Sequence, residues 1–259
     1  MGKMLTPHFR RLSQMLGHIK NTIRDFRCWI LRQKARNQGT LDITDSTLII
    51  APHPDDETIG CGGLITHLIT SGNPPYVAIL TGGGGSLHNH SDITEETVIE
   101  ARRKLTLDSA CELGLPAANI HFLDFKDGSI SARPKTEMER LRSLIAELKP
   151  ANILVPHSGE GWPDHLAARE IGISLASANT NVWEYCVWMW YYNVWNLDWH
   201  NARKLHLSPA EHKAKLRAVH AYVTPKAPCG APWSGVLPAP FIRANTTRTE
   251  LYFHLNNDC

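Results

Sequence analysis

From residue 40 onward, short apolar runs alternate with longer stretches that are apolar on one helical face. The apolar runs predict buried strands at residues 47–51, 76–80, 120–123 and 152–155. The amphipathic stretches predict helices at residues 62–71, 94–113, 135–148 and 164–178. This alternation is typical of an α/β fold, in which a mainly parallel sheet has helices on both faces. Ligands bind beyond the carboxyl ends of such strands, so we expect the chemistry in the residues that follow them.

The first 36 residues follow another pattern, in which apolar positions are separated alternately by four and three residues. These positions are Leu5, Phe9, Leu12, Leu16, Ile19, Ile23, Phe26 and Ile30. The spacing predicts an amphipathic N-terminal helix with a seven-residue repeat. Asn37-Gln38-Gly39 then predicts a linker. We therefore divide the chain into a helix and linker at residues 1–39 and a main domain at residues 40–259.

Three interpretations fit the predicted helix at residues 4–36. It docks on its own domain or on another subunit, it lies on an anionic membrane surface, or it binds a further partner. The strict heptad favours a helical partner, and hence a helix-mediated oligomer. Basic residues beside the apolar face, together with Phe26 and Trp29, favour a membrane surface instead. The sequence leaves these interpretations open.

The charge of the chain is unevenly distributed. The whole chain has 27 Lys and Arg residues against 25 Asp and Glu residues, a formal net charge of +2. Residues 1–36 contain nine basic residues and one acidic residue, a net charge of +8, and the remainder carries 18 basic and 24 acidic residues, a net charge of −6. An acidic main domain argues against nucleic acid as its partner.

The cysteines and the hydropathy of the chain indicate in which cellular compartment we expect the protein. The six cysteines are scattered without a Cys-x-x-Cys pair, which fits a reducing compartment and neither a zinc ribbon nor a disulfide framework. No apolar run reaches the roughly 18 residues of a membrane span, and the N-terminus lacks the continuous apolar region of a signal peptide. We expect a cytoplasmic protein. The basic N-terminal helix suggests, as an alternative, peripheral attachment to the inner face of the membrane.

The first predicted strand leads directly into Pro52-His53-Pro54-Asp55-Asp56-Glu57. Clustering an imidazole and three carboxylates beside a buried strand is costly unless something compensates the charge, and a divalent metal ion would do so. His53 and Asp56, three residues apart in a turn, can both reach one ion, which leaves Asp55 free to accept a proton. The alternative is a polar loop whose acids cap the next helix, a role that suits Glu57.

The fourth predicted strand is followed by Pro156-His157 and then by Trp162-Pro163-Asp164-His165. We expect Asp164 to cap the next helix, which places His165 in its first turn, facing the same crevice as the first loop. A set of two histidines and one aspartate with an open fourth position is typical of catalytic zinc sites. Such a metal lowers the pKa of a bound water toward about 7 and polarises a carbonyl. Fe²⁺ fits the same ligands.

Residues 51–57, Ala-Pro-His-Pro-Asp-Asp-Glu, resemble the Ala-His-Pro-Asp-Asp-Glu signature of the LmbE-like/PIG-L de-N-acetylases, and residues 163–165 resemble the end of that family's His-x-Asp-His motif. The resemblance spans roughly residues 47–178. It implies a Rossmann-like fold and zinc-dependent removal of acetyl groups from N-acetylglucosamine-type sugars, including sugars joined to inositol, lipid or antibiotic cores. The residue roles that it implies are metal ligation by His53, Asp56 and His165, general base catalysis by Asp55, and substrate contact by Arg102.

The sequence departs from this family at Trp162, which replaces the first histidine of the second motif. Tryptophan can stack on a sugar but cannot relay a proton. We therefore assign Trp162 and Asp164, with Arg102, to substrate binding. His157 is our candidate for the missing proton transfer, and its alternative is a loop histidine bonded to backbone. A second departure is Leu105, where the family often has glutamate.

Two function classes follow from these residues. The first is a zinc hydrolase acting on an acetylamino sugar, including one carried by a glycolipid or lipid-linked glycan. The second is a catalytically weak sugar-binding relative, in which Trp162 marks lost proton transfer. A nucleotide-binding domain is less consistent, since no Gly-x-Gly-x-x-Gly follows the first strand.

The last 80 residues carry most of the tryptophans. We predict a strand at residues 187–192, within a packed, substrate-side lobe formed by residues 180–259.

Overall fold

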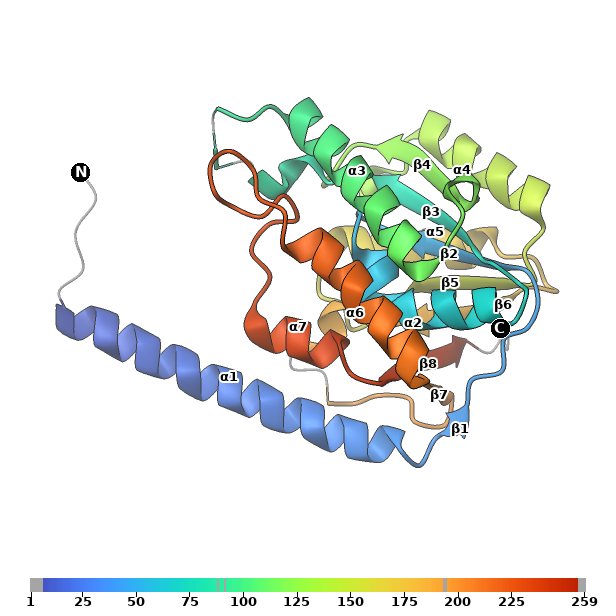
Figure 1. Ribbon diagram of the computed structural model, residues 1–259. Helices are drawn as coiled ribbons and strands as arrows, with labels where there is room; N and C mark the ends of the chain where they lie inside the picture. Colours follow the sequence, from blue (N-terminus) through green and yellow to red (C-terminus); the bar gives the residue numbers. More distant parts are fainter. Residues whose placement is uncertain (1–6, 88, 91, 193–194, 256–259) are drawn as a thin grey trace.

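The computed structural model describes residues 7–255 except for residues 88, 91, 193 and 194 (Figure 1). Within these residues a single eight-stranded sheet has the order β1-β7-β8-β6-β5-β2-β3-β4. All neighbouring strands are parallel except β8, which is antiparallel to β6 and β7. The strands are β1 Gly39–Thr40, β2 Thr47–Ala51, β3 Tyr76–Thr81, β4 Ile120–Phe125, β5 Asn152–Pro156, β6 Asn181–Tyr185, β7 Ala202–His206 and β8 Thr249–Leu255.

Helices cover both faces of this sheet. Side chains of α2, α3, α6 and α7 share one buried cluster with one face of the strands, and side chains of α4 and α5 share a second cluster with the other face. Their bounds are α2 Asp56–Thr70, α3 Glu95–Leu113, α4 Lys135–Leu148, α5 Pro163–Leu175, α6 Pro209–Val223 and α7 Ala239–Asn245. Short 3₁₀ helices are η1 Gly84–Leu87, η2 Ala117–Asn119, η3 Ile130–Ala132 and η4 Trp188–Trp190. The α/β, Rossmann-like prediction is confirmed.

The central strand β2 is buried along its whole length, because both of its faces are covered. Ile49 contributes to the cluster beneath α2, whereas Leu48 and Ile50 contribute to the cluster beneath α5. β2 and β5 are parallel neighbours, and the helices that follow them lie on opposite faces of the sheet. Loops that diverge to opposite faces leave a crevice at the carboxyl ends of the two strands. Both sequence motifs lie in these loops.

The C-terminal 80 residues extend the same sheet through β6, β7 and β8. The strand predicted at residues 187–192 is wrong, because Trp188–Trp190 form η4. Glu160 is the reason that a 3₁₀ helix forms here. Its carboxylate accepts hydrogen bonds from the backbone amides of Val187, Trp188 and Met189 at 2.8, 2.6 and 3.2 Å. Amides that converge on one carboxylate cannot pair with a neighbouring strand. Gly39–Thr40, at the expected domain boundary, pairs with β7 as a short parallel strand.

The predicted N-terminal helix is present as α1, Pro7–Ala35. Its C-terminal part packs against the end of the sheet, where Cys28, Leu31 and Ala35 are buried in a cluster with residues of β7 and β8. Arg27 is fully buried and donates to the backbone carbonyls of Met189 and Trp190. No helix among the described residues is long and apolar enough to cross a membrane.

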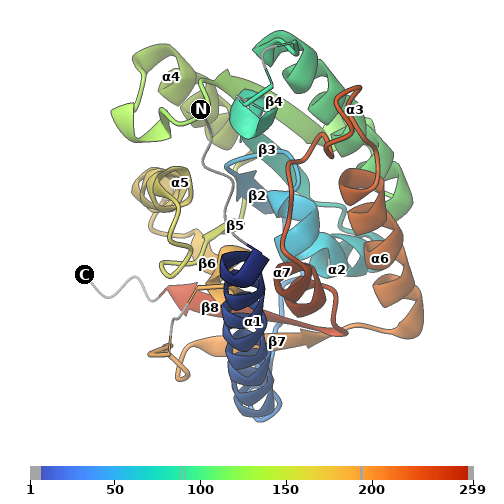
Figure 2. The ribbon, with the colours of Figure 1, turned by 90° about the vertical axis from the view of Figure 1, so that its left-hand side faces the viewer.

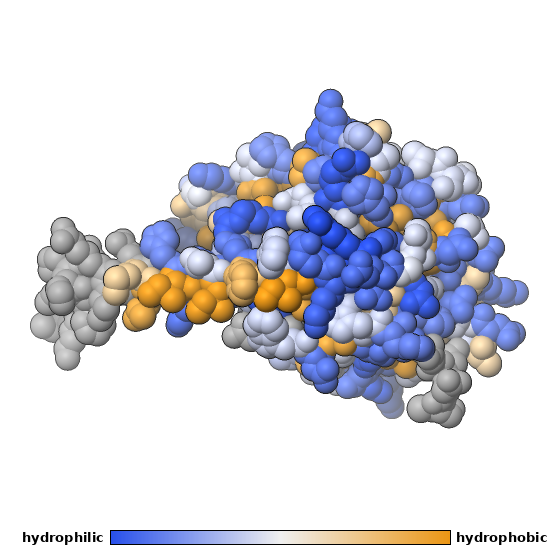
Figure 3. All heavy atoms as spheres, turned by 90° about the horizontal axis from the view of Figure 1, so that it is seen from below, coloured by the Kyte–Doolittle hydropathy of each residue, from blue (hydrophilic) through white to orange (hydrophobic). Residues whose placement is uncertain are grey.

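Within the described part of the chain, the opposite side of α1 is exposed. Figure 3 shows an apolar band along the helix on the face seen from below. Its members are between 48% and 59% exposed: Met15, Leu16, Ile19, Ile23, Phe26 and Trp29. We call these six residues the α1 stripe. The N-terminal part of α1 extends beyond the main domain, on the side where the loop between α6 and α7 lies (Figures 1 and 2).

Candidate active site

The loop after β2 turns sharply to place three polar side chains at the carboxyl end of the sheet. β2 ends at Ala51 and α2 begins at Asp56, so only four residues make the turn. Asp55 adopts a φ of 116°, a conformation that non-glycine residues avoid and that costs about 1–3 kcal/mol. Its amide is held by Oε2 of Glu57 at 3.1 Å. Glu57, for which we expected only helix capping, thus helps to fix the turn.

His53, Asp56 and His165 converge on one point. Oδ2 of Asp56 lies 3.3 Å from Nδ1 of His53 and 3.3 Å from Nε2 of His165. The three donor atoms all lie within 4.8 Å of one another. Asp56 and His165 are almost fully buried, so their charges need a close partner. Two imidazole nitrogens and one carboxylate oxygen are ligands that suit Zn²⁺ or Fe²⁺, and this donor set fits such an ion.

A carboxylate lies close to the outer nitrogen of each histidine. Nε2 of His53 lies 3.2 Å from Oδ1 of Asp127 and 3.4 Å from Oδ2 of Asp164. Nδ1 of His165 lies 3.2 Å from Oε2 of Glu160, which is fully buried. Carboxylates in this position orient metal-binding imidazoles and raise their basicity.

His53, Asp127 and Asp164 form a second group whose donor atoms are within 4.8 Å of one another. Its two carboxylates accept hydrogen bonds from backbone amides. Asp127 accepts from Gly85 at 2.8 Å, and Asp164 accepts from Gly128 and Ile130 at 2.8 and 3.3 Å. Asp56 likewise accepts the amide of His53 at 3.0 Å, so the donor types decide between the groups. We favour His53, Asp56 and His165 as the metal ligands, because this group offers two imidazole nitrogens, whereas the second group offers one.

Arg102 lies against Asp55. Its Nη2 donates to Oδ2 of Asp55 at 3.0 Å and also to the carbonyl of Pro54, while its Nη1 donates to the carbonyl of Gly83 at 3.1 Å. Gly83 has a φ of 64°, and a Cβ atom there would lie 2.3 Å from Nη1 of Arg102. Glycine at this position is therefore what allows the guanidinium to reach Asp55.

The pKa values of the carboxylates in the site are shifted from their ordinary values in different directions. Burial raises the pKa of Asp55 to about 7, although Arg102 works in the opposite direction. Burial also acts to raise the pKa of Asp56, but His165 and His53 outweigh it and the pKa is lowered. The same balance holds at Asp127, where burial is outweighed by the hydrogen bond and charge of His53 and the pKa falls to about 2. Two carboxylates remain ionised, while Asp55 can exchange a proton near neutrality.

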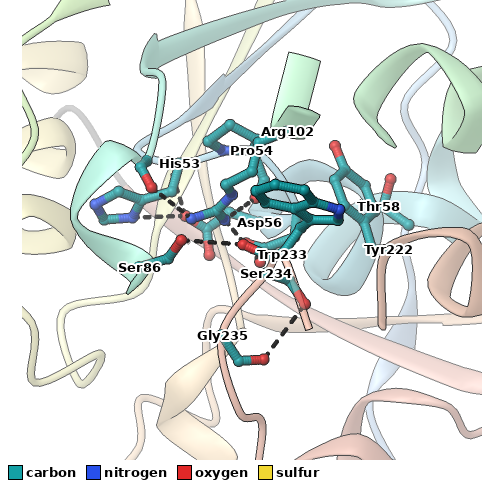
Figure 4. Close-up of polar contacts among 12 residues, drawn as sticks. His53, Pro54, Asp56, Thr58, Ser86, Arg102, Tyr222, Trp233, Ser234 and Gly235 are labelled. Carbon is teal, nitrogen blue, oxygen red and sulfur yellow. Dashed lines mark hydrogen bonds and ion pairs between the residues drawn. The ribbon is translucent and has the colours of Figure 1, made fainter. Parts of the chain in front are cut away.

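A cavity of about 500 Å³ opens over these residues, which is within the size range of small-ligand sites. Trp162, 45% exposed, and Trp188 form part of its wall, with their rings 5.7 Å apart. Trp188 packs in turn on Phe241, with ring centroids 4.2 Å apart. On the other side Ser86 donates to the carbonyl of Trp233 at 3.0 Å, which joins η1 to the loop between α6 and α7 (Figure 4).

The predicted helix cap at Asp164 is wrong. α5 begins at Pro163 with Trp162 as its N-cap residue, and Asp164 lies inside the first turn. Its carboxylate instead binds the amides of Gly128 and Ile130, as described above. Asp164 also lines the cavity, so the substrate contact that we predicted for it stays a prediction.

His157 is not among the residues that line the cavity. Its Nδ1 accepts the amide of Gly159 at 2.9 Å, its Nε2 lies 3.8 Å from Glu184, and its ring packs on Phe253. Burial lowers its pKa. This arrangement matches the alternative interpretation, a loop histidine bonded to backbone, and gives no support to the predicted role in proton transfer.

Asp127, Glu160 and Trp188 were not predicted as site residues. Asp127 stands two residues after the end of β4, so the rule that ligands gather beyond strand ends could have identified it. Glu160 and Trp188 carry no comparable signal. Their importance comes from contacts between segments that are distant in the sequence.

The model of the PIG-L family, described as GlcNAc-PI de-N-acetylase, matches residues 48–176. Diacetylchitobiose deacetylase of Thermococcus kodakarensis is 31% identical over 138 residues, which cover 50% of this chain and 48% of that protein. A Bacillus cereus protein named probable N-acetyl-alpha-D-glucosaminyl L-malate deacetylase 2 is 30% identical over 124 residues, which cover 46% of this chain and 56% of that protein. The chain spans about half the length of these curated relatives.

The fold is shared more widely. A solved structure of a deacetylase triple mutant from the teicoplanin biosynthetic pathway superposes with a TM-score of 0.62 at 16% identity, covering 83% of this chain and 100% of that one. At this identity the likeness shows the fold alone. The family model matches the segment that contains both loops of the site, and named relatives match at about 30% identity. The chain therefore belongs to the PIG-L, or LmbE-like, family.

Proposed function

We propose that this chain is a metal-dependent hydrolase that removes the N-acetyl group from an N-acetylglucosamine-type sugar. One observation carries the proposal: Asp55 and the His53, Asp56 and His165 group line the same cavity, and Arg102 holds the Asp55 carboxylate. The relatives named above are deacetylases of sugars that contain N-acetylglucosamine, which supports this substrate class.

The proposed chemistry divides between the metal and the chain. A Zn²⁺ or Fe²⁺ ion held by His53, Asp56 and His165 would supply a water of lowered pKa and polarise the acetyl carbonyl. Asp55 accepts the proton of the attacking water, and Arg102 keeps the carboxylate in place while it does so. The same carboxyl group, once protonated, can pass its proton to the amine that leaves. This route needs no histidine at position 162.

Trp162 and Trp188 provide apolar ring faces beside the polar centre. Such faces stack on the carbon-bound hydrogens of a sugar ring, and we propose that they hold the sugar while its acetamido group points toward Asp55. We further propose a lipid-linked sugar as the substrate. Its support is the α1 stripe, an exposed apolar surface within a strongly basic segment (Figure 3).

The test is acetate release from free, nucleotide-linked and lipid-linked N-acetylglucosamine by protein loaded separately with zinc and with ferrous iron. We expect release from at least one substrate, its loss after chelation, and its return when metal is restored. His165→Ala serves as a control that should lose bound metal, measured by mass spectrometry. Acetate release from none of the substrates by metal-loaded protein would contradict the proposal.

The second candidate function is sugar binding with little catalysis, and Trp162 in place of a histidine is the observation that favours it. Calorimetric titration of the same sugars distinguishes the two. Binding without acetate release supports the second candidate, whereas turnover of a bound sugar supports the hydrolase.

A further inference from the structure

α1 presents two different faces, and only one of them contacts the other residues that the structure describes. Cys28 and Ala35 are buried on the main domain. Successive residues of a helix turn by about 100°, so these two residues fall on the opposite side of α1 from Ile19. The α1 stripe, defined above, therefore faces away from the sheet. α1 does dock on its own domain, as the first interpretation of the helix has it, but through Cys28, Leu31 and Ala35 and not through the α1 stripe.

The docked face is firmly held, so α1 cannot simply roll to bury the stripe. Arg27 and Arg32 donate to backbone carbonyls of η4, α7 and β8, and the Arg32 guanidinium lies 4.4 Å from the centre of the Trp190 ring. Asp25 accepts from Arg243 at 2.6 Å. Rotation that turned the stripe inward would break all of these contacts. Its six large apolar side chains consequently need an external partner.

Charge identifies the partner that fits. Residues 1–36 contain nine basic residues, of which Arg27 and Arg32 bind carbonyls of the main domain, and one acidic residue, Asp25, which pairs with Arg243. Lys20 is exposed on the part of α1 that carries the stripe. A second copy of the same helix would bring two strongly positive segments together, which is unfavourable. An anionic surface complements this charge, and a helix with an apolar face, basic residues and exposed aromatic rings is typical of interfacial membrane helices.

We propose that the α1 stripe binds the surface of an anionic lipid bilayer, with α1 lying in the plane of the interface. Phe26 and Trp29 stack at 5.9 Å and supply the aromatic part of the inserted face. The free part of α1 extends beyond the main domain on the side of the loop between α6 and α7, which contributes Ser234 and Leu237 to the active-site cavity (Figure 1). The proposal does not depend on catalysis, because it concerns binding alone.

The experiment measures partition of the full-length protein onto vesicles of phosphatidylcholine and phosphatidylglycerol in equal amounts, by co-sedimentation. Ile19→Ala with Ile23→Ala removes apolar area while keeping a good helix former, and we expect the partition coefficient to fall at least about tenfold. The matched control is Leu107→Ala with Leu216→Ala, which removes two leucines of similar exposure from α3 and α6. We expect this control to bind as the unchanged protein does.

A second variant tests the electrostatic part without altering any packed residue. Lys20→Gln should weaken binding to the anionic vesicles about fivefold at low salt and leave binding to pure phosphatidylcholine vesicles unchanged. Three outcomes would overturn the proposal: no binding of the unchanged protein to anionic vesicles, equal binding of the Ile19 and Ile23 double variant, or a dimer in light scattering that this double variant dissociates. The last outcome would assign the stripe to a second copy of the chain.

Discussion

Nη2 of Arg102 donates a hydrogen bond to Oδ2 of Asp55 at 3.0 Å, while the same guanidinium binds the carbonyls of Pro54 and Gly83. The family resemblance suggested substrate contact for this arginine. Its position shows a further task, which is to hold the carboxylate that we propose as the general base. Arg102 thereby ties α3 to the strained turn after β2.

Replacing Arg102 with lysine should lower kcat by one to two orders of magnitude, because a single ammonium cannot reproduce the fork that binds three oxygens. Metal content should remain normal, since Arg102 contacts none of the three ligands directly. Arg103→Lys, at a more exposed position on the same helix, is the control. Equal kcat values for the two variants would contradict the positioning role.

Asp55→Asn should retain bound metal and lose most of its turnover, by about 10²-fold or more, because an amide cannot accept the proton of the attacking water. Acetate release and metal analysis on the same sample provide the measurement. Asp124→Asn, in β4 and half exposed, is the control. Near-normal deacetylation by Asp55→Asn would show that another group is the base.

Glu160→Gln should weaken zinc affinity by about 10–100-fold, since it removes the negative charge that lies 3.2 Å from Nδ1 of His165. Competition with a chromophoric chelator gives the dissociation constant. Glu170→Gln, on the exposed face of α5, should leave zinc affinity unchanged. An unaltered affinity in Glu160→Gln would mean that His165 is oriented by packing alone.

Trp162→Ala should raise KM for the sugar substrate severalfold and change kcat less, because the ring contributes a stacking surface and no proton. The control is Trp195→Ala, which removes an exposed tryptophan that does not line the cavity. If kcat falls and KM stays constant, Trp162 takes part in the chemical step instead.

Lys215 and Glu250 form an ion pair at 2.6 Å between α6 and β8, and both side chains are almost fully buried. Lys215→Met leaves the Glu250 carboxylate buried without its cation, so the free energy of unfolding should fall by about 3–5 kcal/mol. Denaturant unfolding followed by circular dichroism measures this change. Lys213→Met, exposed on the same helix, should stay within about 0.5 kcal/mol of the unchanged protein.

The order of amino acids was sufficient for the features that are local. The apolar run at residues 47–51 predicts β2, and the run is continuous because both faces of that strand are buried. The heptad spacing predicts α1. His53, Asp55 and Asp56 could be recognised because they are contiguous and follow a strand. The start of α2 was placed six residues late, since its first turn consists of the polar site residues and hides the apolar pattern.

Other features depended on which strands lie side by side. β2 and β5 are about 100 residues apart in the chain, and only their pairing brings His165 to His53 and Asp56. Glu160 became important because it binds the backbone of η4, a contact that also turned an expected strand into a 3₁₀ helix. The direction of the α1 stripe was decided in the same way. Periodicity shows that a helix has an apolar face, but the contacts of Cys28 and Ala35 on the main domain determine where that face points.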